Sequence, residues 1–331
     1  MFKKIGVFKD FTDGTIKCVF ENETKKIIEI SLLFNKNDKN VVCLPTHHFC
    51  NMGCKMCHLT NKGLNKKMMP ISYEDFMNAL LECLHYFNND KKKLVLSFMG
   101  VGEPLLNLEL IKNIYLNENI IKEKYGYEHI GYAVSTMMPN TNVDKLTELV
   151  NEYNIPLKLH FSLHTPDDEK RYELIPNTKV SIDEAMKLLD KYRKKITKNK
   201  VLMDKYIKLH TTKDPVEIHY TLIKGVNDDE HLLDKLIEIE KKYEICLKFI
   251  RFNPVNELER SSDEEYWIKR LENEVPNLRV KSYSPPGREV GSSCGEFTKH
   301  YYHEEIETEE QLQEFLSWKE KHELKEELIT I

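Results

Sequence analysis

Long apolar runs are missing from this sequence of 331 residues. No stretch approaches the roughly 18 consecutive apolar residues that a membrane span requires, so we expect no membrane contact. The first twenty residues hold four lysines and two aspartates instead of the apolar stretch of an export signal. Internal repeats and flexible linkers are also missing. With 40% apolar and 10% aromatic residues, the composition excludes a disordered chain, and we predict a folded cytoplasmic protein.

A strong net charge is missing as well. The chain has 49 Lys+Arg against 54 Asp+Glu, a formal net charge of −5, which is not typical of a protein that binds nucleic acid. The negative charge is concentrated in residues 301–331, where ten glutamates and three lysines give a net of −7 and leave the first 300 residues at +2. The acidic C-terminal segment therefore masks the mildly positive net charge of the first 300 residues. The total net charge does not exclude an RNA partner.

Cysteine is present in quantity, with eight residues in the chain. Without an export signal, so many cysteines indicate metal or redox chemistry rather than a disulfide framework. Cys18, Cys83 and Cys246 each have apolar neighbours in periodic segments, so we interpret these three as small buried hydrophobic residues. The remaining five, Cys43, Cys50, Cys54, Cys57 and Cys294, are candidates for chemistry.

The chain divides into three predicted parts. Two strand-like runs, Thr15–Phe20 and Lys26–Phe34, predict a small N-terminal β-hairpin unit within residues 1–40. Strands and helices then alternate through residues 41–300. The predicted strands are Val41–Leu44, Leu94–Met99, Ile130–Ser135, Leu157–Leu163, Val216–Ile223, Leu247–Phe252 and Leu278–Tyr283. The predicted helices are Ser72–Phe87, Leu108–Lys122, Val143–Glu152, Ile182–Lys194, Glu230–Lys242 and Glu264–Glu274. A polar C-terminal helix over Ile306–Leu328 is expected in the acidic segment 301–331.

Six strand–helix units in series predict an α/β fold with a parallel sheet and right-handed crossovers. Either an open, doubly wound sheet or a barrel satisfies this pattern. Ser72 with Asp75, and Ser181 with Glu184, have the spacing of capping pairs at the starts of two of the helices.

The strongest chemical signal is the segment CNMGCKMC at 50–57, shortly after the first strand of the alternating region. Three thiolates on one tight loop, Cys50, Cys54 and Cys57, can each bind a different iron of a [4Fe–4S] cluster and leave the fourth iron open. A structural zinc site with His58 as fourth ligand is the alternative. Zinc sites usually draw ligand pairs from two separated places, and His58 directly follows Cys57, which strains a tetrahedral arrangement.

The CxxxCxxC spacing resembles that of the radical S-adenosylmethionine (SAM) superfamily. Six further segments, with a C-terminal cysteine motif among them, resemble its RlmN/Cfr family of adenosine methyltransferases. These segments are Gly102-Glu103-Pro104 with its neighbours, Val134–Thr136, Phe161–His164, Lys224–Asp228 and Ile250–Pro254, followed by Ser293–Phe297 around Cys294. They occur in family order from about Glu29 to Phe297. The resemblance implies a partial (β/α)6 radical SAM barrel that binds a [4Fe–4S] cluster and S-adenosyl-L-methionine.

The resemblance also implies a set of SAM-binding residues at the carboxyl ends of the predicted strands, where binding sites of parallel barrels collect. The set is Gly102, Glu103, Ser135, Ser162, Leu163, His164 and Asn253. Glu103 can accept from the SAM ammonium group. The alternatives are that Glu103 caps a helix and that Ser162 and His164 are ordinary polar groups at a strand end.

Three catalytic residues follow from the resemblance alone. In the family, the cysteine equivalent to Cys294 is first methylated, its S-methyl group becomes a carbon radical, and this radical adds to an amidine carbon of adenine. The equivalent of Cys43 then releases the product by forming a disulfide bond, and a glutamate accepts the ring proton. Glu29 is the best match for this glutamate, and Glu21 and Glu23 fit less well.

The expected substrate is an adenosine of rRNA or tRNA, methylated at C2 rather than C8, and the expected electron donor is a flavodoxin or ferredoxin. We expect a monomer. The family usually has a helical domain before the hairpin, whereas here the hairpin starts almost at Met1, so a peptide, protein or free nucleotide is an alternative substrate. A basic run that includes Lys187, Lys191, Lys194 and Lys195 is suggestive of RNA binding, although such runs are more often solvated faces. A non-catalytic, zinc-stabilised binding module is the remaining alternative.

Overall fold

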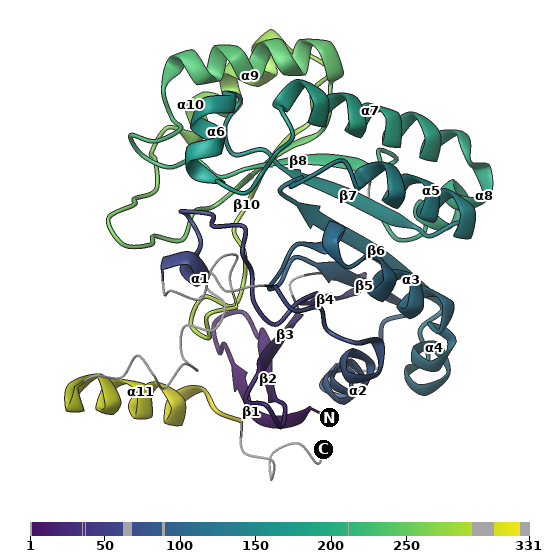
Figure 1. The fold of residues 1–331 in the computed structure, drawn as a ribbon, viewed down its shortest axis with the longest axis vertical. Helices are drawn as coiled ribbons and strands as arrows, with labels where there is room; N and C mark the ends of the chain where they lie inside the picture. Colours follow the sequence, from purple (N-terminus) through teal and green to yellow (C-terminus); the bar gives the residue numbers. More distant parts are fainter. Residues whose placement is uncertain are drawn as a thin grey trace.

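The computed structural model describes residues 2–34, 36, 38–61, 68–87, 90–210, 212–292 and 308–324. Their strands form one sheet of ten, hydrogen-bonded in the order β1-β2-β3-β4-β5-β6-β7-β8-β9-β10, which is also their order along the chain (Figure 1). The sheet therefore continues from the N-terminal strands into the alternating region without a break.

The N-terminal strands form a meander that leads into the main sheet. They are β1 (Lys3–Lys9), β2 (Ile16–Glu21) and β3 (Ile27–Leu33), and β3 pairs antiparallel with β4 (Asn40–Cys43). The sequence predicted β2 and β3 but not β1. In β1 only Val7 and Phe8 are fully buried, because it is an edge strand with charged residues on its open side, so its apolar signal is short.

The remaining strands are parallel, and this confirms the predicted α/β fold. After β4 come β5 (Lys93–Phe98), β6 (His129–Thr136), β7 (Leu157–Ser162), β8 (Val216–Tyr220), β9 (Leu247–Ile250) and β10 (Val280–Tyr283). A doubly wound sheet needs a point where the strand order reverses. Here each strand lies beside the one before it, so the right-handed crossovers all turn the same way and the sheet curls into a partial barrel.

Helices connect the parallel strands around the outside of the curved sheet (Figure 1). They are α1 (His58–Asn61), α2 (Tyr73–Leu84), η1 (Pro104–Leu106), α3 (Leu108–Leu116), α4 (Asn119–Tyr125), α5 (Val143–Tyr153), α6 (Asp168–Leu174), α7 (Ile182–Lys198), α8 (Lys200–Tyr206), α9 (Glu230–Tyr243) and α10 (Glu264–Glu274). The two predicted capping pairs are confirmed, since Ser72 accepts from the Asp75 amide and Ser181 from the Glu184 amide. The structure divides the predicted helix Leu108–Lys122 into α3 and α4. At the break, the Asn117 side chain donates to the Asn113 carbonyl, a local bond that competes with helix continuation.

Alternate residues of the parallel strands face the helices or the inside of the barrel. On β7, for example, Leu157, Leu159 and Phe161 join the main hydrophobic core, while Lys158, His160 and Ser162 line an internal cavity. Because both faces of β7 are covered, even these polar residues are buried, and every residue of the strand is buried.

The C-terminal helix α11 (Glu309–His322) packs on the edge strand β1 (Figure 1). Trp318 stacks on Phe8 with ring centroids 4.9 Å apart, and its Nε1 donates to the Glu289 carbonyl at 2.7 Å. The Leu324 amide donates to the Val7 carbonyl at 2.8 Å. The predicted helix Ile306–Leu328 is thus confirmed in its middle, and both of its predicted ends lie outside the described residues. Within the described part of the chain, no helix is long and apolar enough to cross a membrane.

The stability of the fold should depend on pH through Glu240, a fully buried residue of α9. One carboxylate oxygen accepts from the Ile245 amide at 3.0 Å, the other has no hydrogen-bond partner among the described residues, and burial raises the pKa of Glu240 to about 8. A raised pKa means that the folded state favours the neutral acid, so stability is full at low pH and falls as the pH rises through the folded-state pKa.

We expect Glu240→Gln to remove most of the loss in the free energy of unfolding that occurs as the pH rises. Since one pKa unit corresponds to about 1.4 kcal/mol, the wild type should lose a few kcal/mol between about pH 5 and pH 9, and the variant much less. Urea denaturation at several pH values measures the difference. Glu238→Gln, at an exposed position of the same helix, is the matched control. Parallel pH profiles for the wild type and Glu240→Gln would contradict the assignment.

Candidate active site

The three cysteines of the 50–57 segment lie at the carboxyl end of the barrel, on the loop that follows β4. All three line a single cavity of about 660 Å³ that occupies the inside of the barrel and that we call the lumen cavity. The loop turns at Gly53, which has a φ of 70°, and the Cys57 amide donates to the Cys54 carbonyl at 3.0 Å. The Lys55 amide also bonds to the Leu174 carbonyl at the end of α6. The tight loop therefore presents its thiols to one space.

The thiols suit a cationic metal group. Burial raises the pKa of Cys50 to about 12 and that of Cys54 well above its ordinary value, so without a cation both thiols stay protonated. Zinc would draw its sulfur ligands to about 3.8 Å from one another. Among the described residues, no group that includes these cysteines has three ligand atoms within 4.8 Å of one another. The described residues therefore do not hold these three thiols at the spacing of a single zinc site.

Two glycines of the segment after β5 allow the cysteine loop to sit close to it. A Cβ on Gly100 would lie 2.7 Å from the Leu44 carbonyl carbon, and one on Gly102 would lie 2.5 Å from His47 Nδ1. Gly102 also has a φ of 108°, which other residues rarely adopt. Backbone bonds from the Leu44 amide to Ser97 and from the Thr46 amide to Val101 join the two segments. The glycines thus position the start of the cysteine loop.

Glu103 caps a helix, as considered from the sequence, and its position also leaves it available to a ligand. Its side chain caps η1 by accepting from the Leu105 amide at 3.1 Å, and the same oxygen accepts from Thr136 Oγ1 at 2.7 Å. The second oxygen accepts from the Met137 amide at 3.0 Å. Glu103 also lines the lumen cavity, and its burial raises its pKa to about 7 against the lowering effect of these bonds. A cationic ligand in the cavity would favour the charged form.

Five other predicted SAM-binding positions line the same cavity: Gly102, Ser135, Ser162, His164 and Asn253. Ser135 Oγ lies 3.2 Å from Ser162 Oγ. His164 Nδ1 accepts from the Thr221 amide at 3.1 Å, so Nε2 carries the proton of the neutral ring, and burial lowers the pKa of His164 to about 3. The side chain of Leu163 does not line the cavity but packs in the main core. Leu163 can therefore contribute through its backbone alone.

Cys43 and Glu29 have different surroundings. Cys43, at the end of β4, lines the lumen cavity and pairs in register with Ser31 of β3. Glu29 lies two residues before Ser31 and does not line the cavity. Its carboxylate forms a buried ion pair with Lys17 Nζ at 2.9 Å, and Lys17 also donates to the Gly291 carbonyl at 3.2 Å. The structure thus brings Cys43, but not Glu29, to the cysteine loop.

Cys294 lies outside the described residues, so its place and its disulfide with Cys43 stay predictions. The described range before Cys294 ends two residues earlier, at Ser292. Ser292 lines the lumen cavity, and its Oγ lies 2.9 Å from Ser31 Oγ, next to Cys43 in the register of β3 and β4. The segment that leads to Cys294 therefore reaches the same cavity.

Arg171 of α6 organises the site and was not found from the sequence. It is fully buried and donates to three acceptors from separate loops: the Met137 carbonyl after β6 at 2.7 Å, the Leu163 carbonyl after β7 at 3.3 Å, and Thr178 Oγ1 at 3.0 Å. In the sequence, Arg171 stands in the polar run DEKRYEL, which is typical of a solvated helix face. No motif distinguished it from its charged neighbours.

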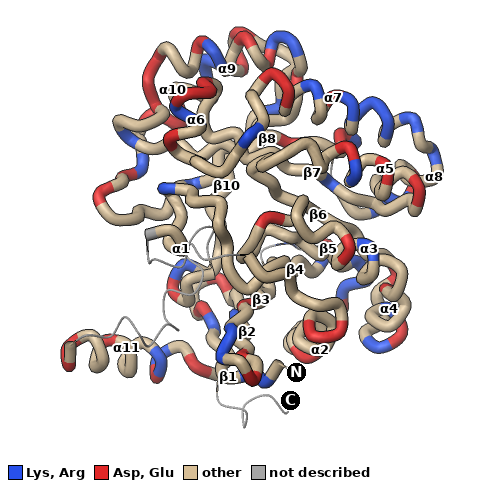
Figure 2. Tube along the Cα trace, in the orientation of Figure 1, with Lys and Arg blue, Asp and Glu red and all other residues tan. Residues whose placement is uncertain are grey.

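The basic run lies along α7, on the outside of the barrel (Figure 2). Lys187, Lys191, Lys194 and Lys195 each lie within 2.8 Å of a carboxylate oxygen. These pairs reduce the positive field that an RNA strand would meet. The run therefore adds little support for RNA binding.

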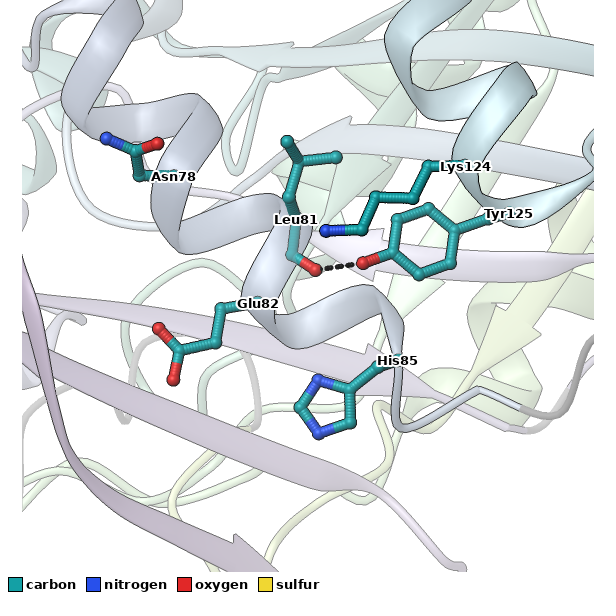
Figure 3. Close-up of a pocket in the computed structure, with 6 residues that line it drawn as sticks. All are labelled: Asn78, Leu81, Glu82, His85, Lys124 and Tyr125. Atoms are coloured by element: carbon teal, nitrogen blue, oxygen red, sulfur yellow. Dashed lines mark hydrogen bonds between the residues drawn. The ribbon is translucent and has the colours of Figure 1, made fainter.

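A separate hollow lies between α2 and α4 on the outside of the barrel and is lined by six residues (Figure 3). The Tyr125 hydroxyl donates there to the Leu81 carbonyl, and Glu82 pairs with Lys4 at 3.0 Å. The side chains that line it include no cysteine and no cluster of acids. This hollow joins two helices and offers no catalytic set.

The comparisons with known proteins agree with this geometry. Residues 44–237 match the model of the Radical SAM superfamily, and the chain belongs to that superfamily. A radical SAM methyltransferase from Sphaerobacter thermophilus has the same fold, with a TM-score of 0.68 and 21% identity over 89% of this chain and 80% of that one.

Within the superfamily, the chain belongs to the RlmN family. It is 30% identical to a probable dual-specificity RNA methyltransferase RlmN of Clostridium botulinum (strain Alaska E43 / Type E3), over 89% of this chain and 78% of the relative. The corresponding protein of Finegoldia magna is 27% identical over 86% and 74% of the two chains. This protein is therefore a radical SAM methyltransferase whose cofactors are a [4Fe–4S] cluster and SAM.

Proposed function

We propose that this enzyme methylates an amidine carbon of adenosine in RNA, C2 rather than C8, with Cys294 as the methyl carrier. The observation that carries the proposal is the lumen cavity, into which Cys50, Cys54, Cys57 and Cys43 all project. Its RlmN relatives bear the name of dual-specificity RNA methyltransferases, which supports RNA as the substrate. When bound, the cluster and SAM supply the one-electron chemistry that generates a carbon radical.

The chain's own residues have separate tasks in this proposal. Cys50, Cys54 and Cys57 hold the cluster, and Glu103, Ser135, Ser162, His164 and Asn253 hold SAM. The three bonds that Glu103 accepts fix its carboxylate before any ligand arrives, so little side-chain freedom is lost when it receives an ammonium group. Arg171 acts as a positioning residue, because it fixes the loops that carry Met137 and Leu163.

Product release is assigned to Cys43. A thiolate at this position can attack the sulfur of Cys294 and form a disulfide. The bond between that sulfur and the methylene carbon on the substrate then breaks, its electron pair stays with the carbon and the adenine ring, and a proton from solvent completes the methyl group. The half-buried position of Cys43 on the cavity wall supports this role. Glu29 is assigned to accept the ring proton. In the structure, its carboxylate pairs with Lys17, which also bonds to the Gly291 carbonyl, so this role requires Glu29 to leave the ion pair and reach the cavity.

The proposal predicts a specific product. Reconstituted enzyme incubated anaerobically with a reductant, methyl-labelled SAM and total RNA should yield labelled 2-methyladenosine, detected by mass spectrometry of nucleosides after complete digestion. A sample without reductant is the control for chemistry that does not need an electron. Absence of labelled methyladenosine from every RNA fraction would overturn the RNA substrate, and labelled 8-methyladenosine would overturn the assigned carbon.

The methyl carrier can be examined independently of RNA. Peptide mass spectrometry of the purified protein should find one added methyl group on the peptide that contains Cys294, and none on that peptide in Cys294→Ala. An unmodified Cys294 after incubation with SAM and reductant would contradict its role as the carrier.

A further inference from the structure

The amino-terminal half of the lumen cavity carries a cluster of charged and imidazole side chains that the proposed chemistry does not use. Lys158 and His160 project from β7, Glu217 and His219 from β8, Lys248 from β9 and Lys281 from β10. All six line the cavity whose carboxyl end holds the cysteines. Strand register brings them together, since His219 pairs with Lys248 and Lys248 with Lys281.

Three ammonium groups share one carboxylate in this cluster. Glu217 is fully buried, and its Oε2 lies 2.8 Å from Lys158 Nζ and 2.6 Å from Lys281 Nζ. Its Oε1 pairs with Lys248. Burial opposes the charged form of Glu217, but the hydrogen bond from His219 and the nearby side chains of His160, Lys158 and Lys248 hold the pKa of Glu217 below its ordinary value, so this carboxylate is charged. Two positive charges of the cluster are left without a counter-charge, which is costly in a buried site.

The rest of the cavity wall does not supply that counter-charge. Among the residues that the structure describes, seven lysines and arginines line the cavity against two glutamates, Glu103 and Glu217. Glu103 lies at the opposite end, beside the cysteines. The half of the cavity away from the cysteines is therefore a region of positive potential, in which Lys248 and Lys281 are only partly exposed. Such a region selects an anionic ligand.

A metal ion is the competing occupant, because the ligand atoms of His160, Glu217 and His219 lie within 4.8 Å of one another. Both oxygens of Glu217 already accept from lysines, and three ammonium groups would repel a divalent cation. The same ammonium groups would attract an oxyanion. Both ring nitrogens of buried His160 have no hydrogen-bond partner among the described residues, and a neutral imidazole can donate to an oxyanion.

We propose that Lys158, Lys248, Lys281 and His160 form a phosphate-binding site in the amino-terminal half of the barrel. A ligand whose phosphate group binds there has the remainder of its structure directed along the cavity toward Cys43 and the cysteine loop. If the proposed function holds, the phosphate belongs to the nucleotide that is methylated, but the site itself does not depend on that function.

Phosphate binding can be measured without turnover. Calorimetric titration of the cluster-loaded enzyme with inorganic phosphate, at constant ionic strength, should show one site. Lys281→Met should weaken binding by about tenfold or more, since a hydrogen bond to a charged group contributes about that much. Lys248→Met serves as a second variant in case the first folds poorly. Lys187→Met, which removes an ion-paired lysine on the outer face of α7, is the matched control and should leave affinity unchanged.

Two outcomes would overturn the site: no phosphate binding by the wild type, or equal affinity in the wild type and both lumen variants. A third outcome would also overturn it: the wild type binds one equivalent of zinc or iron in addition to the cluster, and His160→Ala does not bind this extra metal. Titrations with adenosine 5′-monophosphate and with a short RNA identify the source of the phosphate. Binding of the mononucleotide supports a free nucleotide, and binding of the RNA alone supports a strand. Neither result depends on whether methylation occurs, so the two proposals can fail separately.

Discussion

Replacement of Cys54 by alanine is expected to remove the iron–sulfur cluster and abolish methyl transfer while leaving the fold intact. In the proposed arrangement each of the three cysteines ligates a different iron, so loss of one thiolate would leave that iron without its protein ligand and the cluster would not be retained. The variant should be colourless after anaerobic reconstitution, and its iron and sulfide content should fall to background. Circular dichroism should still show the mixed α/β spectrum, because Cys54 packs in a small cluster with Met52, Met56 and Ile175, away from the main core.

Cys83→Ala is the matched control for this experiment. Cys83 is also fully buried, but it lies on α2 among the residues of the main core and does not line the lumen cavity. The same change of side chain should therefore leave the iron content and the activity at the wild-type level, at a small cost in stability. A full complement of iron in Cys54→Ala would contradict the assignment of the ligands.

The second large effect is expected at Cys43. Without a second thiol, the adduct between Cys294 and the substrate cannot be released by disulfide formation. Cys43→Ala should therefore stop after a single turnover and accumulate protein covalently linked to RNA. Denaturing gel electrophoresis with labelled RNA detects the linked species, and digestion with a ribonuclease followed by mass spectrometry identifies the linked residue.

Cys18→Ala provides the comparison, because Cys18 is a buried cysteine of β2 that packs in the main core and does not line the cavity. It should turn over repeatedly and leave no linked RNA. Repeated turnover by Cys43→Ala at the wild-type rate would remove Cys43 from the mechanism and would require another group to release the product.

The fold was largely predictable because its main signals are local. The central parallel strands, such as β7 and β8, are buried on both faces and are rich in apolar residues in the sequence. The amphipathic helices between the strands have clear starts, as at Ser72 and Ser181. The choice between an open sheet and a barrel was not predictable in this way. It depends on which strands lie side by side, and no single segment of sequence contains that information.

The same distinction between local signals and long-range contacts applies to the candidate site. The cysteine loop and the Gly102-Glu103-Pro104 segment were found because their residues are consecutive and their spacing is specific. Arg171 was missed because its acceptors at Met137, Leu163 and Thr178 come from three loops. The lysines around Glu217 were missed for the same reason, since each is one charged residue in an apolar strand until the register of β7 to β10 brings them together.

The position of α11 has a consequence for the behaviour of the protein in solution. β1 is the last strand of the sheet, and an uncovered edge strand can pair with the same strand of another molecule. Trp318 covers Phe8, and the Leu324 amide takes up the Val7 carbonyl, which would otherwise be open to such a partner. The segment from α11 to Leu324 therefore blocks self-association through the sheet edge. A shortened chain that ends before Glu309 would expose that edge.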